Sequence, residues 1–79
     1  MFERINEIIA KIEEIRDEIQ ILLGMGKIDF VDYIMIKRGS MDMPEELQMS
    51  VLEQLNEQVD RLKEQIDRLN KIKREMLVF

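Results

Sequence analysis

Isoleucine recurs along the first part of the chain at intervals of three and four residues. The apolar positions are Ile5, Ile8, Ile12, Ile15, Ile19 and Leu22. This spacing keeps the side chains on one face of an α-helix, and most residues between them are charged. The pattern predicts a helix over residues 2–23, which Gly24 and Gly26 can end by adopting left-handed backbone conformations.

A second apolar stripe with the same spacing lies in the last third of the chain. Its members are Leu52, Leu55, Val59, Leu62, Ile66 and Leu69. Upstream, Asp42 and Glu45 have the spacing of a capping box, and Pro44 would fall in the first helical turn, where a missing N–H does no harm. Because no Gly or Pro follows Glu45, the pattern predicts one long helix over residues 43–77.

The segment between the stripes admits two interpretations. Residues 28–37 are rich in β-branched and aromatic side chains, and a strand here would give a prefoldin-like helix–hairpin–helix. The flanking residues instead favour a short helix over residues 30–38, because Asp29 is a suitable N-cap and Gly39 a suitable C′ residue. Residues 26–37 also resemble the helix-turn-helix joint of SHOCT-type modules, in the pattern Gly-Lys-Ile-Asp-x-x-Asp-Tyr-x-x-x-Lys. That resemblance implies a cap followed by a helix.

The three segments together predict an all-α fold in a single domain, residues 1–79, with a long, a short and a long helix. More than about two-thirds of the chain should be helical. The apolar positions beside the two stripes are expected to remain exposed in a single chain: Ile9, Leu23, Val51, Ile72 and Leu77. Exposed flanks of this kind usually mark an interface. We therefore expect a homo-oligomer, most simply a dimer, that forms a coiled-coil-like helical bundle.

The composition excludes most of the side chains that commonly carry out catalysis. The 79 residues include no His and no Cys, which excludes the commonest general base, thiol nucleophiles, disulfides and the commonest transition-metal ligands. The acidic run over residues 13–18 matches a solvated helix face better than a metal site, since the Glu-x-x-His motifs of di-iron bundles are missing. We expect a protein that is not an enzyme and has no catalytic residue, cofactor or metal.

Charge and hydropathy narrow the classes of partner. The net charge is −5 and basic residues are interspersed with acidic ones, which disfavours nucleic acid as a partner. The longest uncharged run, Ile19 to Gly26, is far shorter than the ~20 residues that span a bilayer, and the first residues lack the apolar core of a signal peptide. These features predict a cytoplasmic protein without a membrane span.

The remaining hypothesis is a protein that acts through helix–helix contacts. We expect a self-associating scaffold, adaptor or regulatory protein; the alternative is a small acidic helical chaperone or co-chaperone, prefoldin-like or secretion-type, that binds an apolar client segment. Tyr33 is expected to be a buried anchor, because no activating base is near it in sequence. The predicted surface for an outside partner, with Ile36 pointing away from the bundle, comprises Ile34, Met35, Ile36, Met41 and Met43.

Overall fold

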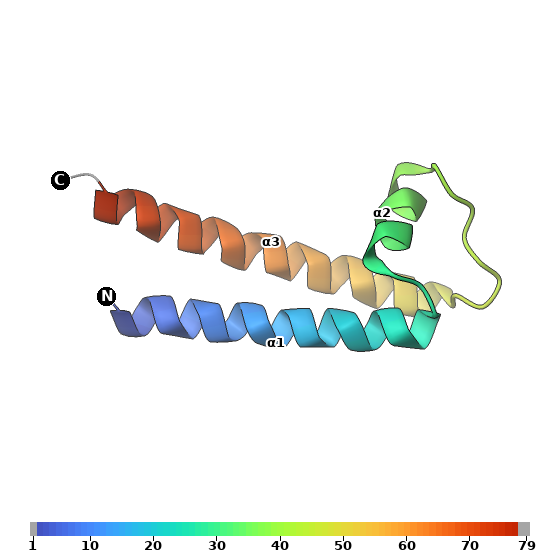
Figure 1. Ribbon diagram of the computed structural model, residues 1–79, viewed down its shortest axis with the longest axis horizontal. Coiled ribbons are helices and arrows are strands. Elements are labelled where there is room, and N and C mark those ends of the chain that lie inside the picture. The colour runs from blue at the N-terminus through green and yellow to red at the C-terminus, as the bar shows by residue number, and fades with distance from the viewer. Residues whose placement is uncertain (1, 78–79) are drawn as a thin grey trace.

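The fold is a helical hairpin with a short third helix at its closed end (Figure 1). The structure is a computed structural model that describes residues 2–77. Helix α1 spans Phe2–Gly26, α2 spans Phe30–Arg38 and α3 spans Met49–Leu77. Of the described residues 2–77, 83% are helical and none is in a strand. The all-α prediction is therefore confirmed, and residues 30–38 are helix rather than strand.

Helix α1 runs three residues further than its sequence predicts. Gly24 stays helical, and the left-handed residue is Lys27, with φ 55°. The N–H of Ile28 donates to the carbonyl oxygen of Leu23 and that of Lys27 to Gly24, at 3.2 and 3.3 Å. These two bonds form a Schellman motif, which satisfies the last carbonyl groups of the helix. Gly26 is needed for close packing rather than for a left-handed backbone, since a Cβ there would lie 2.7 Å from Leu47 Cδ1.

Helix α2 has the caps that its sequence predicts, together with a full capping box. The side chain of Asp29 accepts a bond from Asp32 N–H at 2.8 Å, and Asp32 Oδ2 accepts one from Asp29 N–H at 3.4 Å. At the other end Gly39 is left-handed, with φ 76°, and forms a second Schellman motif with Ser40. These caps satisfy backbone groups at both ends of a helix only nine residues long.

Helix α3 begins six residues later than predicted, at Met49. The Asp42–Glu45 capping box does not form a helix start; instead the N–H of Leu47 donates to the carbonyl oxygen of Pro44 in an isolated turn. The N–H groups of Val51 and Leu52 then donate to Gln48 at 3.1 and 3.2 Å. The break before Met49 lets Leu47 enter the core against Gly26, and it leaves enough chain to return from α2 to the hairpin.

The core lies between α1 and α3, and α2 covers it at the closed end. Leu55 is fully buried at its centre. On α1 the predicted stripe is buried or half-buried throughout. On α3 the positions that are buried or half-buried at 4-3 spacing are 51, 55, 58, 62, 65, 69, 72 and 76. The seam with α1 therefore uses Val51, Gln58, Gln65 and Ile72, each one residue before the predicted positions 52, 59, 66 and 73.

Because of this register, most of the apolar positions that were predicted to be exposed beside the stripes are buried. Leu23, Val51 and Ile72 are all buried, whereas Ile9 is exposed as predicted; the side chain of Leu77 lies outside the described residues. The seam was hidden in the sequence because Gln58 and Gln65, both half-buried, occupy two of its positions. The line at 52, 59, 66 and 73 is the one that α2 partly covers.

Candidate functional site

Apolar side chains on one side of the hairpin are buried near its closed end and exposed near its open end. On α1, positions 23, 16, 9 and 2 share one side of the helix: Leu23 is buried, Arg16 is charged and exposed, Ile9 is 40% exposed and Phe2 is 75% exposed. On α3, Val59 is buried and Ile66, one heptad later, is 40% exposed. The half-buried Ile5 and Ile12 lie next to these positions on α1. We call Phe2, Ile5, Ile9, Ile12 and Ile66 the open-end strip.

The shape of the molecule explains why the strip is bare. The Cα atoms extend over 52 × 22 × 16 Å, and the radius of gyration is 15.4 Å, against about 11.6 Å for a compact domain of this length. The accessible surface is 6226 Å², whereas a folded monomer of this mass exposes about 5,000 Å². A two-helix layer of this kind has no second layer to cover its apolar face outside α2.

A second surface surrounds Phe30, at the start of α2, whose side chain is 39% exposed. One pocket lies between this ring and the seam of the hairpin, lined by Arg16, Ile19, Gln20, Phe30 and Leu62. A second, of 380 Å³, lies between α2 and α3 and is lined by Phe30, Tyr33, Ile34, Lys37, Arg38, Val59, Asp60 and Lys63. The two pockets share Phe30, and we call them together the Phe30 groove.

Tyr33 fixes α2 to α3 beneath this groove. Its ring is buried, and its hydroxyl donates to Asn56 Oδ1 at 2.6 Å. Burial, and then the negative charge of Asp60, raise the pKa of the Tyr33 phenol above its ordinary value, so the hydroxyl remains a donor. The hydrogen bond joins a residue of α2 to a residue of α3 and so holds the two helices together.

The predicted partner surface in the middle segment is mostly packed inward. Ile34, Ile36 and Met43 pack against the core, Met41 is half-buried, and only Met35 has an exposed side chain. The expectation that Ile36 points away from the bundle is therefore wrong. The outward-facing apolar residues of α2 are Phe30, Val31 and Met35. Phe30 was not placed on the partner surface from the sequence, because it was treated only as one of the residues that favour a strand. The signal that could have found it is its position directly after the N-cap Asp29, at the start of α2.

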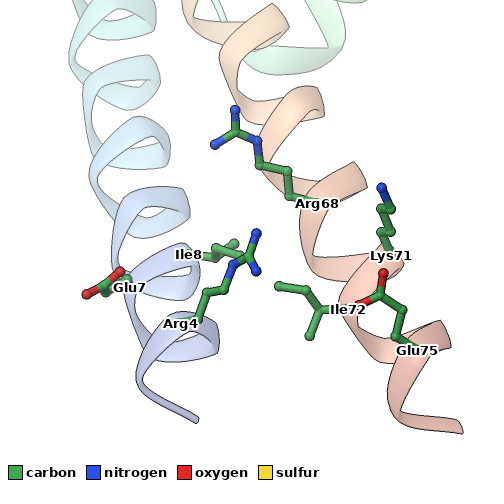
Figure 2. A pocket seen from close by; sticks show the side chains of 7 residues that line it. All are labelled: Arg4, Glu7, Ile8, Arg68, Lys71, Ile72 and Glu75. Atoms are coloured by element: carbon green, nitrogen blue, oxygen red, sulfur yellow. The ribbon is translucent and has the colours of Figure 1, made fainter. Parts of the chain in front are cut away.

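A pocket of 550 Å³ lies at the open end, where α1 and α3 diverge (Figures 1 and 2). Figure 2 shows Ile8 and Ile72 pointing toward each other between the helices, with Arg4 reaching into the gap. Arg68, which also lines the pocket, is 3.4 Å from Glu64 in an i,i+4 pair. The charged residues that line the pocket are exposed and nearly balanced in sign: Arg4, Glu7, Arg68, Lys71 and Glu75. Because these opposite charges nearly cancel, the pocket offers little net attraction to a charged ligand.

In residues 2–77 no three His, Cys, Asp or Glu side chains are grouped so as to hold a metal ion. A membrane-crossing helix is also absent from this part of the chain, since none is long and apolar enough. What the described residues offer is an apolar strip and an apolar groove, both of which suit contact with another helix.

Comparison with known proteins places the chain in a family. Two uncharacterized proteins from Helicobacter pylori, of strains 26695 and J99, are each 51% identical over 79 residues, which is the whole of this chain and of theirs. The crystal structure of HP1531, a protein of unknown function from Helicobacter pylori, has a TM-score of 0.96 over all of this chain and 95% of that one. A family model described as a protein of unknown function matches residues 1–79, and the chain thus belongs to the DUF2443 family.

Proposed function

We propose that the protein is a non-enzymatic helical scaffold, adaptor or regulatory protein that self-associates, as a dimer, through the open-end strip. The exposure of Phe2, Ile9 and Ile66 along one side of the hairpin is the observation that supports this proposal. The proposal includes the cytoplasmic location that charge and hydropathy predict.

The excess of exposed area is of the size that a dimer would remove. The accessible surface is larger by about 1,200 Å² than the scaling for a folded monomer of this mass. A standard interface buries about 800 Å² on each partner. Two hairpins packed through their open-end strips would form a four-helix section, while each α2 stays at its own closed end.

The test is the molar mass in solution of variants that place a charge in the strip. Ile9→Asp and Ile66→Asp each put a carboxylate into the proposed interface, so we expect the mass to fall from twice the chain mass of 9.5 kDa to that of one chain. Ile21→Asp is the matched control, since Ile21 is 58% exposed and lies on another side of α1. Light scattering at micromolar concentration measures all three.

Two results would overturn the proposal: a wild-type protein that is monomeric at this concentration, or strip variants that keep the dimer mass. The chaperone alternative makes a different prediction for the same samples. There, the strip variants lose affinity for apolar peptides, while the mass of the peptide-free protein is that of one chain before and after the substitution.

A further inference from the structure

Cations are concentrated around the Phe30 groove in a chain that is acidic overall. The groove is lined by Arg16, Lys37, Arg38 and Lys63 and by a single carboxylate, Asp60. The residues that line the two pockets therefore carry a net charge of +3, against −5 for the whole chain. Within residues 2–77 none of these four cations forms an ion pair with a carboxylate, so their charge is available to a partner.

The floor of the groove is apolar and is divided by one aromatic ring. Ile19 and Leu62 lie on one side of Phe30, and Ile34 and Val59 lie on the other. Side chains three or four residues apart on a helix are about 5–6 Å apart, and a pair of them can straddle a ring. An exposed aromatic residue among buried and half-buried aliphatic ones is also the composition of an interface centre.

We infer that the Phe30 groove is a docking site for an acidic amphipathic helix of another protein. Every element in the described part of the chain is a helix, so the available recognition mode is a helix in a groove rather than a strand added to a sheet edge. Leucine-like side chains at i and i+3 or i+4 enter the two pockets, and carboxylates on either flank face the four cations. This docking does not depend on self-association.

A second copy of this chain that docked through its Ile66 face would be a poorer match for the groove. Its exposed Ile66 is three residues after Lys63 and seven before Lys73. A copy that presented this face would bring like charges to the cationic rim, and like charges disfavour association.

The experiment uses the full-length protein and two synthetic peptides of about 18 residues, long enough for helix formation. Both carry leucine at i, i+3, i+4 and i+7; one has glutamate on the flanks and the other lysine. Fluorescence anisotropy of the labelled peptides measures affinity. We expect the acidic peptide to bind at least about tenfold more tightly than the basic one, with affinity that falls as salt rises.

Charge reversal at the rim is the decisive variant. Lys37→Glu, Arg38→Glu and Lys63→Glu combined should weaken binding of the acidic peptide by about tenfold or more. The matched control, Lys71→Glu, Lys73→Glu and Arg74→Glu combined, changes the net charge by the same amount at the open end and should leave the affinity within about twofold. All six side chains are exposed, and circular dichroism verifies the fold of each variant.

Four outcomes would overturn the inference: equal binding of both peptides, equal loss in both charge variants, competition by an oligonucleotide as effective as by unlabelled acidic peptide, or a change of molar mass on rim reversal without loss of peptide binding. The last would mean that a second copy occupies the groove. Ile9→Asp separates this inference from the proposed dimer, because it should abolish self-association and leave peptide affinity unchanged.

Discussion

Alanine substitution at two glycines of α1, two positions apart, should change stability in opposite directions. At Gly24 an added Cβ meets no heavy atom within 4 Å, so Gly24→Ala gains helix propensity only. We expect a rise of about 0.5–1 kcal/mol in the free energy of unfolding. At Gly26 the same atom would lie 2.7 Å from Leu47 Cδ1, with Ile28 and Val51 both at 3.7 Å.

The cost at Gly26 follows from the burial of Leu47. Leu47 is buried in the core cluster, so it cannot move away from a new methyl group without leaving that packing. Overpacking of this kind costs about 1–3 kcal/mol, and the gain in helix propensity offsets at most about 1 kcal/mol. Gly26→Ala should therefore lower the free energy of unfolding by about 1–2 kcal/mol.

Thermal unfolding followed by circular dichroism, at one protein concentration, measures the difference. Since 1 kcal/mol shifts Tm by about 4–8 °C in a domain of this size, the two variants should differ by about 6–24 °C. Adding Leu47→Ala to both should shrink this difference, because the clash is then absent. Equal Tm values for the two single variants would show that the contact with Leu47 does not limit how closely α1 and residue 47 approach.

Three further substitutions test other parts of the fold. Leu55→Ala, at the fully buried centre of the core, should lower the free energy of unfolding by about 2–5 kcal/mol in urea titration; a loss below 1 kcal/mol would contradict its central position. Lys27→Gly should raise Tm by a few degrees, since glycine adopts the left-handed conformation at that C′ position without strain, and an unchanged Tm would refute that strain. Because the pKa of Tyr33 is raised in the folded protein, its contribution to the free energy of unfolding is complete below pH 10, the ordinary pKa of a tyrosine, and is lost as the pH rises from there through the folded pKa. Tyr33→Phe should therefore lose less stability than the wild type over that pH window. Identical pH profiles for the two proteins would count against the pKa shift.

The sequence predicts most of the helical layout because local signals and packing agree there. The isoleucine stripe of α1 and the caps of α2 at Asp29 and Gly39 appear in the structure as the spacing and residue types indicate. The start of α3 does not, since Asp42, Pro44 and Glu45 have the chemistry of a helix start without the surroundings. Residue 47 has to enter the core beside Gly26, and that tertiary requirement overrides the local signal.

The candidate surfaces were harder to predict than the helices. A sequence pattern identifies an apolar position but not which neighbour covers it. Leu52, Val59 and Ile66 are equivalent by spacing, yet only the first two lie where α2 can cover them, and this depends on where the chain crosses α3. The cations around the Phe30 groove could not be predicted either. Arg16, Lys37 and Lys63 come from three different helices, and only the packing of those helices brings them together.

The hairpin topology sets the order in which contacts can form. At the closed end, Gly26 and Leu47 are about twenty residues apart in sequence, whereas Ile8 and Ile72 at the open end are roughly sixty residues apart, and the entropy of closing a loop grows with its length. Folding should therefore start at the closed end and proceed along the seam toward the termini. Unfolding fluctuations run the other way, so amide protection should decrease steadily from residues near Leu22 and Leu55 toward both chain ends.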